Sequence, residues 1–284
     1  KAIIDELEDL PVYVKTVPEF YDLMSGVAKV GQLQDIELAD LLGRDPIPAD
    51  PALIEACIFD KVVMVTGAGG SIGSELCRQI VRCQPTELIM FDISEHALYQ
   101  ISKELDRLKS QGKHAARIIP LLGSVQNQKR LESIFSEFKV NTVYHAAAYK
   151  HVPMVEYNVV EGVSNNVFGT LSAGRAAVKA GVENFVLIST DKAVNPTSLM
   201  GVSKRLSEMV MQLNNLPGQT AFITVRFGNV LGSAGSVVPL FERQIQAGGP
   251  VTVTDPQMTR YFMTISEACQ LILQACVLGD GGEI

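Results

Sequence analysis

A hydroxyl, a carboxylate and an amine stand next to one another at Thr190, Asp191 and Lys192. They close the apolar run NFVLIST, which predicts a buried strand, so all three lie at its carboxyl end. Met200 and Lys204 follow in a helical stretch, and their i, i+4 spacing places them on one helix face. A carboxylate and an amine can exchange protons with a substrate, whereas a thioether cannot. We therefore predict acid–base chemistry at this strand end, with Met200 limited to packing.

The sequence places a glycine-rich turn, TGAGGSIGSEL, between a predicted strand and a predicted helix. Its glycines have the spacing G-x-x-G-x-x-G. Such glycines let the backbone approach a pyrophosphate, which binds the free N–H groups at the start of the helix. The turn therefore predicts a dinucleotide site. Its expected cofactor contacts are Gly67, Gly69, Gly70, Ser71, Ile72 and Gly73.

Asp92 ends the next predicted strand, where dinucleotide-binding folds place the carboxylate that binds the adenosine ribose. A carboxylate there repels a 2′-phosphate, and no arginine follows in DISEH, so we predict NAD rather than NADP. Ser124 and Val125 follow the third predicted strand, where the adenine is expected. Ala146 and Ala147 end the fourth strand with small side chains that let a cofactor lie close.

The same run, HAAAYK, begins with His145 and ends with Lys150. A single histidine in an apolar run is more often a hydrogen-bonded core residue than a catalyst, so we predict that His145 belongs to the core. Lys150 supplies a cation beside the expected cofactor.

Short apolar runs alternate with helical stretches from residue 61 onward, which predicts an α/β fold. The candidate strands span residues 62–67, 87–91, 117–123, 142–148, 184–190 and 221–227. Near-continuous apolar strands are typical of a parallel sheet covered on both faces. We predict a doubly wound Rossmann sheet of order 3-2-1-4-5-6, with a possible extra strand. Pro120 interrupts the third run, and this order places that strand at an edge, where proline is tolerated.

The chain divides into three parts by its patterns. Residues 1–59 contain two helical stretches, VPEFYDLMSG and DIELADLLG, and a Pro/Asp-rich linker, and we expect an arm that packs on the main domain. Residues 60–228 form the expected NAD-binding domain. Residues 229–284 form an expected small substrate-binding cap, with a helix at 237–246, a strand at 250–255 and a helix at 265–278. We expect both chain ends to be cuts in a longer protein.

Composition excludes several classes of function. The net charge is −7 and the cations are scattered, which argues against binding of nucleic acid or contact of this fragment with a membrane surface. The five cysteines show no C-x-x-C spacing, so we expect neither a metal site nor disulfides, and a reducing, cytoplasmic setting. No apolar run approaches the roughly 20 residues that span a bilayer.

Five segments together resemble the extended short-chain dehydrogenase/reductase superfamily: TGAGGSIG, NNVFGT, STDKAVNPTSLMGVSK, RFGNVLGSAGSVVPLF and MTRYFMT. Within it, residues 60–284 closely resemble the CapD-like bacterial nucleotide-sugar 4,6-dehydratases, in the long type with Met in place of the usual Tyr. Residues 1–59 resemble the segment that links a membrane-anchored half to the catalytic domain. The resemblance implies a homo-oligomer on the cytoplasmic face of the inner membrane that serves capsule or lipopolysaccharide synthesis.

The resemblance also implies a reaction. A UDP-N-acetylhexosamine, most often UDP-GlcNAc, becomes the 4-keto-6-deoxy sugar by oxidation at C4, loss of water across C5 and C6, and return of the hydride to C6. Lys204 would hold the nicotinamide ribose, and Thr190, or else Ser189, would bind the C4 oxygen. Asp191 would be a buried acid or an ionised base, and Lys192 the C5 base. By the same resemblance, Asn166 and Val230 would contact the cofactor, and the substrate residues would be Lys150, Asn229, Ser236, Val237 and Arg260.

Two other functions stay open at this point. A UDP-sugar epimerase uses the same hydride removal without elimination, and an NAD-sensing domain would bind cofactor without turnover. The sequence leaves undecided which hexosamine is preferred, and whether Asp191, Lys192 or water takes the C4 hydroxyl proton. Retention of configuration at C5 is expected by resemblance alone.

Overall fold

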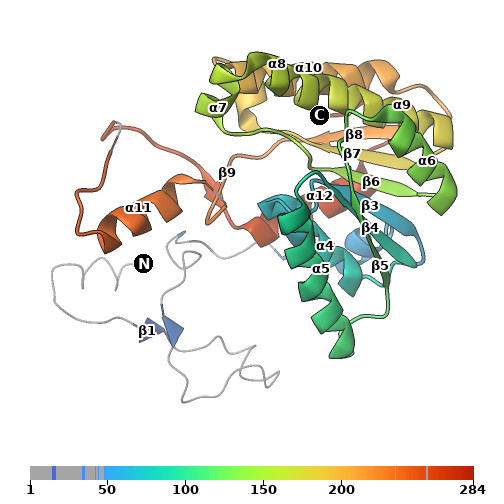
Figure 1. Cartoon of the computed structure of the whole chain (residues 1–284), viewed down its shortest axis with the longest axis horizontal. Helices are drawn as coiled ribbons and strands as arrows, with labels where there is room; N and C mark the ends of the chain where they lie inside the picture. Colours follow the sequence, from blue (N-terminus) through green and yellow to red (C-terminus); the bar gives the residue numbers. More distant parts are fainter. Residues whose placement is uncertain are drawn as a thin grey trace.

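The computed structural model describes residues 15–16, 34–35, 42, 44, 48–233, 235–253 and 255–284. Six parallel strands form one sheet in the order β5-β4-β3-β6-β7-β8 (Figure 1), which confirms the predicted order 3-2-1-4-5-6. Within the described residues, no further strand joins it. The strands are β3 (Val62–Thr66), β4 (Glu87–Asp92), β5 (Arg117–Leu122), β6 (Thr142–His145), β7 (Asn184–Ile188) and β8 (Ala221–Val225).

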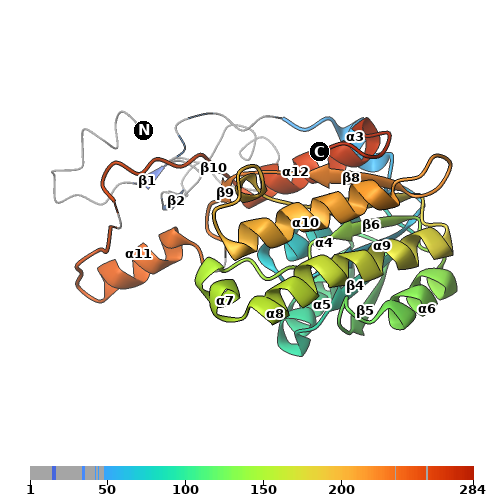
Figure 2. The same ribbon diagram turned by 90° about the horizontal axis from the view of Figure 1, so that it is seen from above.

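Alternate residues of a strand belong to two separate hydrophobic cores, one on each face of the sheet. Val63 and Val65 point into one buried cluster, whereas Met64 between them belongs to the other. Because successive side chains of a strand face opposite sides, apolar runs with no polar alternation require helices on both faces. On one face lie α4 (Ser71–Arg82), α5 (Glu95–Ser110) and α12 (Ile265–Leu278), and on the other α6 (Gln128–Phe138), α9 (Gly169–Ala180) and α10 (Leu199–Asn214) (Figures 1 and 2).

The position of α12 corrects one prediction. The helix itself has the predicted bounds, but we expected it in the substrate cap, and it packs instead against α4 and against β7 and β8 of the sheet. The reason is its apolar face, where Cys269, Ile272 and Leu273 are completely buried in the core. The helices that cover this face of the sheet therefore include α12, which follows β8, the last strand of this sheet, by about 40 residues in sequence.

Strand β5 lies at the edge of the sheet, as Pro120 predicted. Proline has no N–H to donate to a neighbouring strand, and an edge strand has one side without a partner strand, so proline is tolerated there.

Between β8 and α12 the chain forms a two-stranded parallel ladder and one helix. β9 (Asn229–Val230) pairs with β10 (Phe262–Met263), and α11 (Val237–Gln246) confirms the predicted helix. The strand predicted over 250–255 is not observed: Val251 and Val253 are exposed, and among the described residues they belong to no ladder. A strand exists only by pairing, and the described part of the chain offers their alternating pattern no partner strand. α11 lies away from the sheet in both views (Figures 1 and 2).

The described part of the N-terminal arm contacts α12. The Arg44 guanidinium donates to both carboxylate oxygens of Glu267, at 2.7 and 3.1 Å, and α3 (Pro51–Glu55) packs against the same helix. β1 (Lys15–Thr16) pairs with β2 (Gln34–Asp35). The two helices predicted in the arm lie outside the described residues. Among the helices that the structure does describe, none has the length and apolar character of a membrane span.

Candidate active site

The glycine turn after β3 leaves no room for side chains. Gly67 has φ +68°, and a Cβ on it would lie 2.7 Å from the backbone nitrogen of Ala147. A Cβ on Gly73 would lie 2.0 Å from the carbonyl oxygen of Gly67. Gly70 caps α4 without a side-chain hydrogen bond, and the start of a helix attracts an anion through its N–H groups and dipole. The turn therefore has the shape that a pyrophosphate requires.

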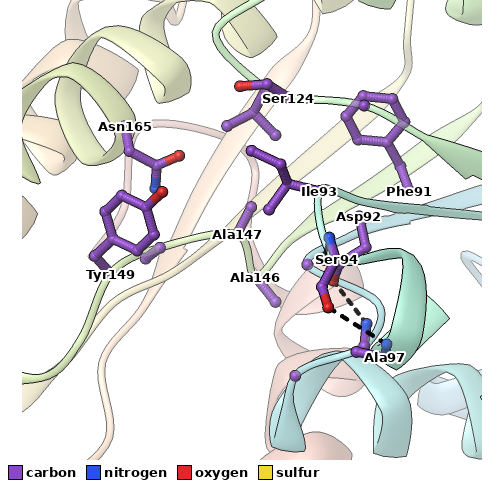
Figure 3. Close-up of a pocket in the computed structure, with 16 residues that line it drawn as sticks. Phe91, Asp92, Ile93, Ser94, Ala97, Ser124, Ala146, Ala147, Tyr149 and Asn165 are labelled. Atoms are coloured by element: carbon purple, nitrogen blue, oxygen red, sulfur yellow. Dashed lines mark hydrogen bonds between the residues drawn. The ribbon is translucent and has the colours of Figure 1, made fainter. Parts of the chain in front are cut away.

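Asp92 is fixed at the mouth of this turn. Its Oδ2 accepts a hydrogen bond from the Gly69 N–H, and its Oδ1 accepts one from the Ser94 N–H, both at 2.8 Å. The carboxylate borders a cavity of about 270 Å³ (Figure 3), which is also lined by the predicted Ser124, Val125, Ala146 and Ala147. The residues predicted to surround an adenosine thus lie together.

Two more cavities continue along the carboxyl edge of the sheet. One of about 650 Å³ is lined by Ser71, Ile72 and Lys150, and one of about 220 Å³ is lined by Thr190, Lys192 and residues of α10. Ala146 and Ala148 line all three cavities, so they form one groove. Doubly wound sheets bind ligands at this edge.

Thr190, Asp191 and Lys192 form a hydrogen-bonded chain beside the inner end of the groove. Thr190 and Lys192 line the inner cavity, whereas Asp191 lines none of the three cavities. Thr190 Oγ1 donates to Asp191 Oδ1 at 2.9 Å, and Lys192 Nζ donates to the same oxygen at 3.0 Å and to Asn229 Oδ1 at 3.2 Å. The β9–β10 ladder brings Asn229 here, because Asn229 N–H donates to the carbonyl of Tyr261. Predicted residues far apart in sequence therefore meet around one carboxylate.

Asp191 is half-exposed, with 48% of its side chain accessible, so the buried, protonated form is not observed. Partial burial by itself would raise its pKa, but the hydrogen bonds from Lys192 and Thr190 outweigh it and lower the pKa. The group is therefore an ionised carboxylate. Arg260, with Asp191 and Lys192, lines a small neighbouring cavity of about 330 Å³.

Met200 and Lys204 lie on the same face of α10 and both line the inner cavity. Both are buried. Burial lowers the pKa of Lys204 to about 8, and the negative charge of Glu208 opposes that shift. Gly201 lets the turn that carries Asp191 and Lys192, η3 (Asp191–Ala193), approach α10, because a Cβ there would lie 2.5 Å from the Lys192 carbonyl oxygen.

Asn166, predicted as a cofactor contact, supports a loop of the site. It lies in the π-helical turn η2 (Ser164–Phe168) and is completely buried. Its amide donates to the Tyr149 carbonyl and to Ser203 Oγ, both at 2.9 Å, and accepts from the Tyr149 N–H at 2.8 Å. It lines none of the three cavities. We therefore interpret Asn166 as support for the loop that carries Lys150, and its contact with the cofactor stays a prediction.

The remaining predicted residues divide similarly. Val230 lines the inner cavity. Ser236 and Val237 lie at the start of α11 and line none of the three cavities, so their role in substrate binding stays a prediction. His145 is confirmed as a core residue, with Thr66 Oγ1 at 2.8 Å and Thr170 Oγ1 at 3.1 Å. Burial, with a smaller effect of Lys204, lowers its pKa to about 3.

One buried cluster was missed by sequence reasoning. Ser189 was considered as an alternative to Thr190, but its hydroxyl donates to Glu208 Oε1 at 2.6 Å. Glu208 is also bound by Arg226. The i, i+4 spacing of Lys204 and Glu208 was the available signal, and nothing in the sequence pattern linked it to Arg226. In the part of the chain that the structure describes, no group of His, Cys, Asp or Glu side chains could hold a metal ion.

Comparison with known proteins identifies the family of this chain. Residues 63–284 match the family described as Polysaccharide biosynthesis protein. The chain belongs to this family. It is 51% identical over 269 residues to the capsular polysaccharide biosynthesis protein CapD of Staphylococcus aureus, which covers 94% of this chain and 44% of that protein. It is 46% identical over 275 residues to the probable polysaccharide biosynthesis protein EpsC of Bacillus subtilis, covering 96% and 45%. The chain thus spans less than half the length of these family members.

Other similar proteins include two that are named for nucleotide-sugar substrates. A UDP-glucose 4-epimerase of Rickettsia rickettsii is 34% identical over 228 residues, covering 79% of this chain and 65% of that protein. Among solved structures, Pen from Bacillus thuringiensis superposes with a TM-score of 0.73 at 34% identity, covering 79% and 67%. The dTDP-glucose 4,6-dehydratase DesIV from Streptomyces venezuelae, solved with NAD bound, gives 0.70 at 23% identity, covering 78% and 74%, and so shares the fold.

Proposed function

We propose that the protein is an NAD-dependent nucleotide-sugar 4,6-dehydratase of surface polysaccharide synthesis, a lyase whose substrate is a UDP-N-acetylhexosamine, with UDP-GlcNAc as the first to test. The observation that carries this proposal is the ionised Asp191 carboxylate held between the Thr190 hydroxyl and the Lys192 ammonium at the end of the groove. Elimination requires separate proton transfers at C4, C5 and C6, and this cluster offers three groups for them.

The groove fits NAD by its own geometry. The side-chain-free turn at Gly67 and Gly73 suits a pyrophosphate, and the fixed Asp92 carboxylate suits the two ribose hydroxyls of an adenosine without a 2′-phosphate. Lys204, buried at the inner end, suits the nicotinamide ribose. When bound, NAD supplies hydride acceptance and return. DesIV, which shares this fold, was solved with NAD bound.

The chain's own residues divide the proton transfers. The Thr190 hydroxyl binds the C4 oxygen and relays its proton to Asp191, to which it already donates. The protonated Asp191 then protonates the departing C6 hydroxyl, so one proton moves from C4 to the released water. Lys192, once its ammonium has released a proton to solvent, removes the C5 proton and returns a proton to C5 when the hydride adds to C6. Met200 has no proton to exchange and fills the place where related enzymes carry a tyrosine.

The substrate's diphosphate requires cations in the outer part of the groove. Lys150 lines both the cavity of about 650 Å³ beside the glycine turn and the inner cavity, and Arg260 lines a neighbouring cavity together with Asp191. A guanidinium pairs with phosphate oxygens in bidentate fashion. We propose these two residues, with Asn229, as substrate contacts.

The second candidate is a UDP-sugar epimerase, which the Rickettsia relative favours. Incubation of UDP-GlcNAc with the protein in deuterium oxide, followed by NMR, separates the two. A dehydratase yields a C6 methyl group and deuterium at C5, whereas an epimerase leaves C6 unchanged. A domain that only senses NAD would leave every UDP-sugar unchanged.

The setting of the reaction is also a proposal. Since the named relatives are more than twice as long as this chain, we propose that it is the catalytic part of a membrane-anchored protein, acts at the cytoplasmic face and assembles as a homo-oligomer. Sedimentation of the intact native protein from detergent, with and without the first 59 residues, tests both anchoring and assembly.

A further inference from the structure

Glu208 is a completely buried carboxylate directly behind the candidate active site. We propose that Glu208 is a positioning residue, which holds the ends of β7 and β8 against α10 and provides the negative charge that faces Lys204. It contacts neither of the expected ligands, because it lines none of the described cavities.

Four hydrogen bonds converge on this carboxylate. Oε1 accepts from Ser189 Oγ at 2.6 Å and from Arg226 Nε at 2.8 Å, while Oε2 accepts from Arg226 Nη2 at 2.6 Å and from Arg205 Nη1 at 3.0 Å. Although burial acts in the opposite direction, the bonds from Arg226, Ser189 and Arg205 lower the pKa of Glu208, so it is ionised.

The two partners outside α10 stand next to the reacting groups. Ser189 immediately precedes Thr190, and its N–H donates to the Val225 carbonyl at 2.7 Å. Arg226 immediately precedes Phe227, whose carbonyl accepts from the Asp191 N–H at 3.0 Å. A shift of either strand end would therefore move Thr190 and Asp191 relative to α10.

Glu208 also has an electrostatic effect on Lys204. Lys204 lies one helical turn before Glu208, and the inner cavity also contains the ammonium groups of Lys150 and Lys192. His145, which faces Lys204 from β6, is uncharged because burial lowers its pKa to about 3. Asp191 is engaged by Lys192. Glu208 is thus the carboxylate whose field raises the pKa of Lys204 against burial.

A buried ion pair costs desolvation, and apolar replacement of both partners is often no less stable. Stability alone therefore does not explain why the Glu208 carboxylate is buried here against the partly buried Arg226. Their contacts on both sides of the acid–base cluster supply the reason, because a charged hydrogen-bonded network fixes geometry more narrowly than apolar packing does.

The test compares Glu208→Gln with Glu267→Gln. Glu267 is a matched control, because it is also a buried carboxylate held by an arginine, but at the start of α12. Lysine labelled with 13C at Cε reports the titration of Lys204, assigned with Lys204→Arg, and calorimetry reports NAD affinity of cofactor-free protein across pH.

We expect the Lys204 midpoint to fall by about one pH unit in Glu208→Gln, and NAD affinity at pH 8 to fall about fivefold. Glu267→Gln should keep both values. An unchanged midpoint and affinity in Glu208→Gln, or an equal change in the control, would overturn the proposal.

If Glu208→Gln does not fold, the double variant Glu208→Met/Arg226→Met removes both charges of the main ion pair. Ser189 and the partly exposed Arg205 then lose their acceptor. In this variant the Lys204 midpoint should still fall, since Glu208 is the charge acting on Lys204, and a wild-type midpoint would contradict the proposal. A second measurement, kcat with UDP-GlcNAc, rests on the proposed function and should fall at least tenfold with KM unchanged. The NMR and NAD measurements stand without it, so a failure of the dehydratase assignment is distinguishable.

Discussion

The Lys192 ammonium nitrogen lies 3.0 Å from Asp191 Oδ1, in a pair that is nearly half-exposed on both sides. Solvent screens such pairs, so this one contributes little to folding stability. Its position, between the Thr190 hydroxyl and Asn229, matches the proton transfers that we propose for it.

Removal of either group should abolish turnover and leave the fold intact. We expect Asp191→Asn and Lys192→Ala each to lower kcat with UDP-GlcNAc by about 10² to 10⁴, the usual contribution of a general acid or base. NAD affinity and the melting temperature should change little. Near-normal turnover in either variant would remove that residue from the mechanism.

Met200 should tolerate replacement by another apolar side chain. It is buried on α10 and exchanges no proton, so Met200→Leu preserves volume and should keep kcat within about threefold of wild type. Steady-state kinetics with UDP-GlcNAc measures this. A loss comparable to that of Asp191→Asn would show that the thioether itself takes part.

Gly201 should not tolerate even one methyl group. A Cβ there would meet the Lys192 carbonyl oxygen at 2.5 Å, which would push η3 away from α10. We expect Gly201→Ala to lower kcat at least tenfold and to destabilise the fold by about 1–3 kcal/mol.

Gly174→Ala in α9 is the matched control for that substitution. The new Cβ comes closest to the flexible end of Met211, at 2.7 Å, and lies at an ordinary contact distance of 3.5 Å from Phe222, while the helix gains the higher propensity of alanine. Thermal unfolding and kinetics of the two variants should therefore differ clearly. Equal behaviour would refute the role assigned to the contact between Gly201 and Lys192.

Cofactor affinity should decline as the pH rises through about 8. Burial lowers the pKa of Lys204 to about 8, so its ammonium is charged below that pH and neutral above it. Since the ammonium attracts the cofactor's negative phosphates, NAD should bind more tightly at pH 7 than at pH 9.5. Calorimetric titration of wild type and Lys204→Arg checks this, because arginine stays charged and should remove the decline.

Several features followed from the sequence because they depend on local pattern. The apolar runs and the glycine turn predicted the parallel sheet and the groove, Pro120 marked the edge strand, and the M-x-x-x-K spacing placed two side chains on one helix face. Each of these reflects periodicity or backbone sterics within a few residues, which a sequence displays directly.

Other features were decided by packing between distant segments. α12 joined the sheet layer, Asn166 turned to support a loop, and Glu208 gathered Ser189 and Arg226 behind the acid–base cluster. The charge state of Asp191 was likewise left open by the sequence and fixed by Lys192 and Thr190. A residue's type states which bonds it can make, but its partners and its dielectric surroundings exist only once the chain has folded.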